Sequence, residues 1–189
     1  MSTTATIENR ATCELRADAG DEMALVGMAA RYNTPTKIGG RFTEKIAPGA
    51  FSRSMRSGAD VVCTFNHDVN RVLGRTKSGT LTLKDSPEGL RFRCVLDNAQ
   101  QSHRDLYASV KRGDINGCSF SFSVPEDGDE WDGDERTLRN VNLLDVSVVT
   151  HPAYPGTAVD ARSKGEGRAE TISDDERAAT RDKLDKISL

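Results

Sequence analysis

Long hydrophobic runs, a strong net charge and clustered cysteines are all missing from this sequence. No apolar stretch approaches the roughly 20 residues needed to span a bilayer, and residues 1–8 lack the basic start and apolar core of a signal peptide. Acidic and basic residues nearly balance at a net charge of -3, which excludes a general attraction to nucleic acid or anionic membranes. We therefore expect a soluble, intracellular protein with no nucleic-acid or membrane partner.

Cysteines are few, and they lie far apart, at Cys13, Cys63, Cys94 and Cys118. No pair has the C-x-x-C spacing that zinc sites favour, so we expect buried thiols in a reducing cytosol. Cys118 is the one thiol to check for reactivity, because it precedes Ser119. The acidic run 126–135 does not keep the ligand spacing of a calcium-binding loop. The sequence predicts neither a metal ion nor a cofactor.

What the sequence does contain is a succession of short alternating segments that favour strands. They lie at 13–17, 23–32, 42–47, 61–65, 72–76, 80–84, 90–96, 119–124 and 138–150. In the second of them, Gly27 favours a bend or bulge. Helices are predicted at 50–56 and at 99–112, where Gly113 is the stop signal. The pattern predicts a mainly β domain with flanking helices (α+β), closed or nearly closed into a barrel.

The chain is expected to divide into three parts. Residues 1–22 should form a flexible N-terminal segment and a first strand, with residues up to about Ala11 frayed, and residues 23–162 should form the main domain. Residues 163–189 form a charged tail, in which Ser173 to Glu176 is a possible capping box for a helix running to about Ile187. That helix has too few apolar residues to be stable alone.

The stretch from Gly113 to Phe122 draws attention because a serine there enters a strand from a glycine-bearing turn. Alternation places two phenylalanines, Phe120 and Phe122, on one side and three serines, Ser119, Ser121 and Ser123, on the other. Such a serine is either a positioned nucleophile or part of the polar face of an ordinary strand. Periodicity alone leaves the three serines equivalent.

A serine nucleophile needs a base, and the sequence offers three histidines. His103 lies on the polar side of the predicted helix, where we expect a solvated surface residue. His67 directly follows a buried apolar strand and begins a polar loop, a position where catalytic groups often occur. An ordinary loop histidine is the alternative for His67. His151 ends the last strand, before Pro152.

A third group should orient the imidazole, and Asp145 and His151 are the candidates. Asp145 lies within an apolar run, where an unpaired carboxylate would be costly. In an uninterrupted strand both residues would face the same way, roughly 20 Å apart at about 3.3 Å per residue. Both cannot then contact one imidazole, and His151 could simply pack at the strand end.

Six ordered pieces of sequence resemble the tailed-phage prohead protease family. They are Glu44 to Phe51, Asn66 to Asp68, Val72 to Arg75, Arg112 to Ile115, Ser119 to Phe122, and Asp145 to Thr150 followed by Pro152-Ala153-Tyr154. Each piece is weak alone, but six in this order are a strong signal, and together they span about Met23 to Arg162. The family is related in fold to the herpesvirus capsid maturation protease. The resemblance therefore implies a herpesvirus-protease-like β-barrel wrapped by helices.

The same resemblance implies a serine endopeptidase that processes the phage major capsid protein and its scaffolding segment. It would act inside the assembling prohead in the host cytoplasm and would often cut itself, and self-association is a further expectation. Carried onto this chain, the family's nucleophile falls on Ser119, its histidine on His67 and its usual acidic position on Asp145. The herpesvirus relatives use a second histidine, which keeps His151 as the alternative third member. Ser121 departs from the family, where glycine is common, and adds a second hydroxyl.

Two other functions remain open at this point. One is a non-catalytic capsid assembly or scaffold-docking factor of the same fold. The other is a metal-dependent hydrolase using His67, Asp68 and Asp145, although no H-E-x-x-H spacing occurs. If the chain is a protease, the oxyanion would be held by backbone N–H groups or by a basic side chain, with Arg75 and Arg112 as candidates.

Overall fold

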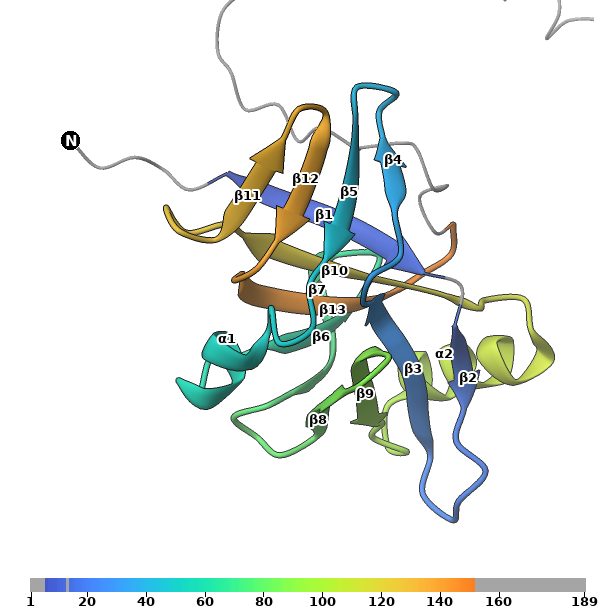
Figure 1. Ribbon diagram of the computed structural model, residues 1–189. Helices are drawn as coiled ribbons and strands as arrows, with labels where there is room; N and C mark the ends of the chain where they lie inside the picture. The colour runs from blue at the N-terminus through green and yellow to red at the C-terminus, as the bar shows by residue number, and fades with distance from the viewer. Residues whose placement is uncertain (1–5, 13, 152–189) are drawn as a thin grey trace, which may run out of the picture.

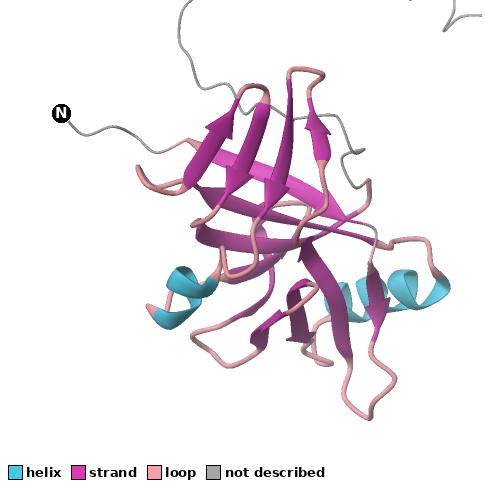
Figure 2. Cartoon of the chain, viewed as in Figure 1, coloured by secondary structure: helices cyan, strands magenta, loops and turns pink. Residues whose placement is uncertain are grey.

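The computed structural model describes residues 6–12 and 14–151, shown in Figure 1. These residues form mainly strands, arranged in three sheets, with two helices at the periphery (Figure 2). The predicted mainly β architecture is confirmed. The closed barrel is wrong for this part of the chain, because each of the three sheets has a linear strand order with two open edges. The predicted tail, 163–189, lies outside the described residues, and the domain boundaries stay a prediction.

Sheet I carries all the candidate catalytic residues except His151. Its order is β1-β10-β13-β6-β7, from β1 (Ile7–Thr12), β10 (Gly117–Ser123), β13 (Asn142–Val149), β6 (Val62–Phe65) and β7 (Asp68–Arg75). All neighbours are antiparallel except β13 and β6, which run parallel. Parallel neighbours bring their carboxyl ends to the same edge of a sheet. The end of β6, next to His67, therefore lies beside β13.

The other two sheets both contact the face of Sheet I that carries Cys118 and Phe120, one through the pair Arg10–Glu44 and the other through Cys118 and Met28. Sheet II has the order β11-β12-β5-β4, from β11 (Asp129–Asp132), β12 (Glu135–Leu138), β5 (Phe42–Ile46) and β4 (Thr36–Ile38). Sheet III has the order β2-β3-β9-β8, from β2 (Leu15–Ala17), β3 (Ala24–Arg31), β9 (Gly89–Val95) and β8 (Leu81–Ser86). In Figure 1 the strands of Sheet II run across those of Sheet I.

The two predicted helices, the glycine that ends the second helix and the bulge in the second predicted strand are confirmed. Helix α1 (Ser52–Arg56) and helix α2 (Gln101–Arg112) occupy the two predicted helical segments. Gly113 ends α2 in the left-handed conformation, at φ 87°, which glycine adopts without steric cost. The register between β3 and β9 shifts between Met28 and Ala30, so the bulge expected in that strand is present.

The prediction of a solvated His103 is wrong, because its side chain is buried. It lies 4% exposed in α2, where Nδ1 accepts a hydrogen bond from the backbone N–H of Asp97 at 3.0 Å. Nε2 is 3.2 Å from the carbonyl oxygen of Val72, to which it donates. Both ring nitrogens thus find backbone partners, which offsets the cost of removing the imidazole from water.

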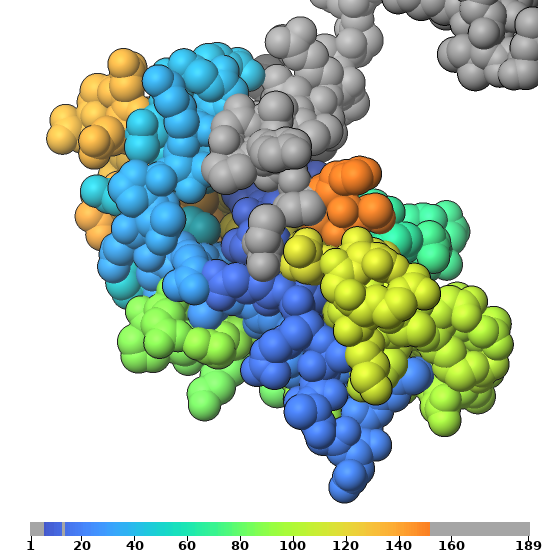
Figure 3. Space-filling model, turned by 90° about the vertical axis from the view of Figure 1, so that its right-hand side faces the viewer, coloured from blue at the N-terminus to red at the C-terminus, as the bar shows by residue number. Residues whose placement is uncertain are grey.

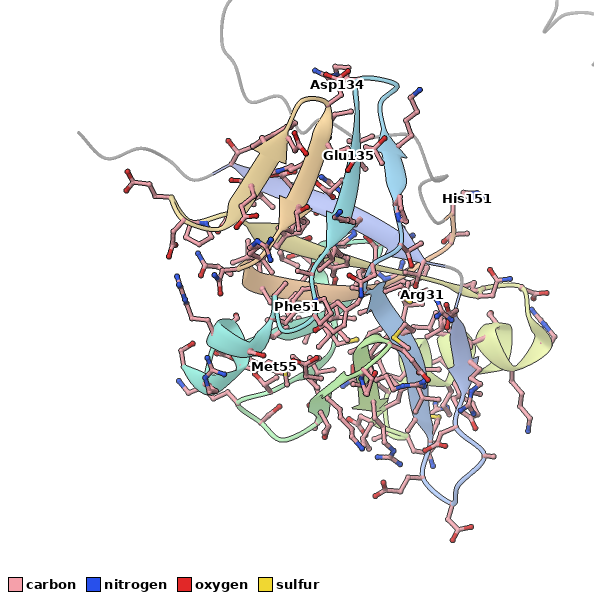
Figure 4. The ribbon with its side chains drawn as sticks, in the orientation of Figure 1. Arg31, Phe51, Met55, Asp134, Glu135 and His151 are labelled. Carbon is pink, nitrogen blue, oxygen red and sulfur yellow. The ribbon has the colours of Figure 1, made fainter. Side chains whose placement is uncertain are left out.

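The core lies between the phenylalanine face of β10 and the residues that begin α1. Phe51 meets Phe120 edge to face at 5.5 Å, and Phe120 stacks on Phe122 at 5.2 Å. Such pairs add to the free energy gained by burying the rings. Figure 4 shows Phe51 and Met55 on the inner side of α1. The serines of β10 therefore lie on the opposite face of Sheet I, as the alternation predicted.

Strand β1 is a second correction. Of the residues expected to be frayed, Ile7 to Ala11 pair with β10, and the pairing runs from Ile7 opposite Ser123 to Thr12 opposite Cys118. The hydrophobic pattern does not reveal this strand because its core-facing side is charged. Glu8 and Arg10 point there, opposite Phe122 and Phe120.

Five charged side chains tie β1 to Sheet II. We call them the buried charge cluster; they are Glu8, Arg10, Glu44, Asp129 and Arg136. Arg10 donates to both carboxylate oxygens of Glu44, at 2.6 and 2.8 Å, and Arg136 donates to Glu8, Glu44 and Asp129. Burial alone would raise the pKa of Glu8, but the hydrogen bonds and charges of Arg136 and Arg10 outweigh it and leave that pKa lowered. The contribution of Glu8 to stability is therefore present above the ordinary glutamate pKa and is lost as the pH falls through the lowered value.

We predict that Glu44→Gln lowers the free energy of unfolding by about 3 kcal/mol, because it leaves two buried guanidinium groups with one carboxylate fewer. The matched control is Glu130→Gln, which breaks the exposed ion pair with Arg139 and should cost less than about 1 kcal/mol. Urea denaturation followed by circular dichroism measures both. Equal losses in the two variants would show that the cluster does not anchor β1.

Candidate active site

His67 lies in the tight turn between β6 and β7. Phe65 pairs with Asp68 across the hairpin, so only Asn66 and His67 connect the strands, both left-handed at φ 54° and 56°. Two positive φ values are what a type I′ hairpin turn requires, and Asn and His enter that region more readily than most residues. The predicted polar loop is therefore this two-residue turn, and it fixes the position from which the imidazole projects.

Ser119 and His67 are in direct contact. Ser119 Oγ lies 2.8 Å from His67 Nε2, within the range of a hydrogen bond. The serine is 4% exposed and the histidine side chain 24% exposed. The pair thus lies in a largely buried setting that is open to solvent on the histidine side.

Asp145 contacts the other ring nitrogen. Both of its carboxylate oxygens lie 3.0 Å from His67 Nδ1. A carboxylate accepts hydrogen bonds and does not donate them, so Nδ1 carries a proton. In the neutral ring Nε2 is then the acceptor, and it faces the Ser119 hydroxyl. The carboxylate also accepts hydrogen bonds from the backbone N–H of Ser121 and the hydroxyl of Thr64, which offsets its burial.

A β-bulge turns Asp145 toward the site. Ser121 pairs with Asp145, but the next residue, Phe122, pairs with Leu143, which leaves Leu144 as the extra residue of β13. The shift lets Leu143 and Val146 both join the core while Asp145 faces the serines. The predicted strand over 138–150 is therefore shorter and interrupted, and its apolar run accommodates a carboxylate through this irregularity.

His151, the alternative third member, lies apart from the imidazole. Its side chain is exposed at the end of β13, as Figure 4 shows. Among residues 6–12 and 14–151, no hydrogen bond or ion pair joins His151 to His67. The structure thus brings His67, Ser119 and Asp145 together and leaves His151 at the surface.

Two hydroxyls approach His67, and they face different nitrogens. Ser121 Oγ is 3.1 Å from Nδ1, whereas Ser119 Oγ is 2.8 Å from Nε2. Asp145 already binds the proton on Nδ1, so Ser121 has no free ring nitrogen to which it can pass its own proton. Ser119 alone of the two faces the nitrogen that can act as a base.

Strand β1 also touches the nucleophile candidate, and sequence reasoning missed this contact. The Arg10 carbonyl oxygen lies 2.8 Å from Ser119 Oγ. A hydroxyl has one proton, so Ser119 donates either to this carbonyl or to Nε2. Activation of Ser119 requires the orientation toward Nε2. A backbone contact from a polar edge strand leaves no signal in sequence periodicity.

Thr64 and Ser147 are the other residues that the sequence did not single out. Ser147 Oγ accepts a hydrogen bond from the backbone N–H of His67 at 2.8 Å and lies 3.0 Å from Thr64 Oγ1. One signal was available: Ser147 is two residues beyond Asp145, so it shares that residue's strand face.

The two arginines considered for holding the oxyanion and the cysteine considered for reactivity have other partners. Arg75 pairs with Asp60, and Arg112 pairs with Asp114. Cys118 points to the core, where its Sγ is 3.0 Å from the carbonyl oxygen of Met28.

The three proposed metal ligands do not form a cluster, although His67 and Asp145 are in contact. Asp68, proposed with His67 and Asp145, accepts hydrogen bonds from the backbone and side chain of Asn70. Within the described ranges, no group of three or more His, Cys, Asp or Glu residues is placed to hold a metal ion.

Comparison with known proteins gives three findings. Residues 11–170 match the family described as caudovirus prohead serine protease. The prohead protease of Enterobacteria phage HK97 is 29% identical over 158 residues, covering 82% of this chain and 66% of that protein, slightly under two thirds. The structure of the bacteriophage T4 capsid assembly protease aligns at a TM-score of 0.48 and 11% identity, covering 77% of this chain and 99% of the other. The family match spans most of the sequence, so this chain belongs to the caudovirus prohead serine proteases.

Proposed function

We propose that this protein is a serine endopeptidase in which Ser119 is the nucleophile, His67 the general base and acid, and Asp145 the residue that orients the imidazole. One observation carries the proposal: an unbroken line of contacts from Ser119 Oγ through His67 to Asp145, at 2.8 and 3.0 Å. This constellation is recognised by geometry rather than by sequence order, and it recurs on unrelated folds.

The chemistry follows from the positions of the protons. Ser119 Oγ attacks the carbonyl carbon of the scissile peptide bond while His67 Nε2 takes the hydroxyl proton. The carbonyl becomes an oxyanion, the C–N bond breaks, and His67 returns the proton to the leaving amine. Water then attacks the acyl-enzyme, again with His67 as base, and releases a carboxylate product. Asp145 stabilises the imidazolium that forms in each half-reaction.

The proposed substrates are the phage major capsid protein with its scaffolding segment, and the protease itself. The family description and the printed name of the HK97 relative support this choice. The proposed location is the interior of the assembling prohead, in the host cytoplasm. No helix among the described residues is long and apolar enough to cross a membrane.

We predict that Ser119→Ala abolishes processing when the chain is coexpressed with its capsid protein, because the attacking oxygen is removed. Ser121→Ala is the matched control, since it removes the neighbouring hydroxyl, and it should retain processing within about tenfold. Capsid-protein mass, measured by mass spectrometry, reports the result. If the capsid protein has the same length with wild type and Ser119→Ala, the chain is not a protease, and the scaffold-docking function takes its place.

We predict that Asp145→Asn slows labelling of Ser119 by a fluorophosphonate by about 10²-fold or more. The new amide can donate to Nδ1 and so holds the proton on Nε2, where it blocks transfer from Ser119. His151→Asn should label at the wild-type rate, because His151 does not contact the ring. Peptide mass mapping identifies the labelled serine. If His151→Asn greatly slows the labelling of Ser119 while Asp145→Asn labels at the wild-type rate, the third residue is His151 and not Asp145.

A further inference from the structure

We propose that Thr64 and Ser147 are positioning residues that join the backbone of His67 to the carboxylate of Asp145 through two hydroxyl groups. We call this pair the hydroxyl relay. The inference rests on the proposed function, because it assigns a role within the same catalytic group. Neither residue lies within hydrogen-bond reach of Ser119 Oγ in the contacts described, so both act through His67 and Asp145.

The relay follows from the register of Sheet I. Ser147 lies opposite Ser119 on one side and opposite Thr64 on the other, so the three hydroxyls form a row across β10, β13 and β6. Thr64 and Ser147 are almost completely buried, at 2% and 0% exposed. A hydroxyl placed this deep needs hydrogen-bond partners, and both side chains find theirs in His67, Asp145 and each other.

The direction of each hydrogen bond is set by the carboxylate. Asp145 only accepts, so Thr64 Oγ1 donates to Oδ2, at 3.3 Å. Because its own proton is donated to Asp145, Thr64 Oγ1 accepts from Ser147 Oγ at 3.0 Å. The carbonyl oxygens of Thr64, at 3.1 Å, and of Val148, at 3.5 Å, are the other acceptors for the same Ser147 proton. Ser147 Oγ in turn accepts from the N–H of His67 at 2.8 Å. Both ends of the relay therefore hold the imidazole, one through its backbone and one through Asp145.

The relay acts on a residue whose backbone conformation is unfavourable. His67 has a φ of 56°, in the left-handed region that L residues enter only at an energetic cost. The Ser147 hydroxyl supplies the partner for its N–H in that conformation. Without this acceptor the turn is free to relax, and a displacement of about 1 Å can cost about 10²-fold in rate.

Neighbouring contacts hold the hairpin in place independently of the relay. The Asn66 N–H donates to the Val148 carbonyl oxygen at 2.8 Å, and the Asn66 side chain exchanges hydrogen bonds with Thr150. Figure 3 shows the end of β13 beside the β6–β7 hairpin on this face. Loss of the relay is therefore expected to misplace the imidazole and not to unfold the hairpin.

Thr64→Val and Thr64→Ser test the relay with full-length protein and a fluorophosphonate probe. Valine has the shape of threonine without the hydroxyl, whereas serine keeps the hydroxyl. We expect Thr64→Val to lower the limiting rate of Ser119 labelling about 10- to 100-fold, with an unchanged half-saturating probe concentration. Thr64→Ser should restore the rate to within about threefold of wild type. A merely structural role would not separate the limiting rate from the half-saturating concentration, nor be rescued by the hydroxyl.

Ser147→Ala tests the other end of the relay, with Ser123→Ala as its control on the same face of the sheet. Ser147→Ala should lose at least as much rate as Thr64→Val, and Ser123→Ala should label at the wild-type rate. If Ser147→Ala does not fold, the comparison of Thr64→Val with Thr64→Ser is sufficient to test the relay. A wild-type rate in Thr64→Val, or equal losses in Thr64→Val and Thr64→Ser, overturns the relay while the proposed protease stands. Failure of the wild-type chain to label at Ser119 overturns both.

Discussion

The parallel pairing of β13 with β6 is the constraint on which the site depends. It places Asp145 opposite Val62 and Ser147 opposite Thr64, so the hairpin that follows β6 projects His67 over the serine face of β10. Parallel neighbours require a long connection, and here the connection is the whole segment between Phe65 and Asn142. The proposed catalytic group is thus assembled from three segments distant in sequence, and its geometry depends on Sheet I as a whole.

Strand β1 couples this site to Sheet II. On its core side Arg10 is held by Glu8 and Glu44, and on its backbone the same residue offers a carbonyl oxygen to Ser119. A slip of one residue would turn Glu8 and Arg10 toward the serines and leave their charges without partners, at a prohibitive cost. The buried charge cluster therefore fixes the register of β1, and with it the carbonyl that competes with His67 for the Ser119 proton.

The polar face shared by β10 and β13 differs from an ordinary strand surface in how its hydroxyls are bonded. Ser119 and Ser121 contact opposite nitrogens of one ring, and Ser147 supports the turn that carries that ring. Because Asp145 sets the tautomer, these similar side chains acquire different roles: one faces a base, one faces a nitrogen that is already protonated, and one accepts from a backbone N–H. The three serines therefore differ in chemical role because of their positions, although they are the same type of residue.

Local pattern was sufficient to predict the helices, the Gly113 stop, the bulged strand at 24–31 and the division of β10 into phenylalanine and serine faces, because each depends on near neighbours in the chain. Ordered motifs were sufficient to select His67, Ser119 and Asp145 as candidates. The tertiary structure alone decided that β1 is a strand, that His103 is buried, that the sheets stay open, and that Asp145 rather than His151 meets the imidazole. Those outcomes rest on contacts between segments far apart in sequence and on hydrogen bonds made by backbone groups, which every residue carries and which sequence periodicity therefore does not report.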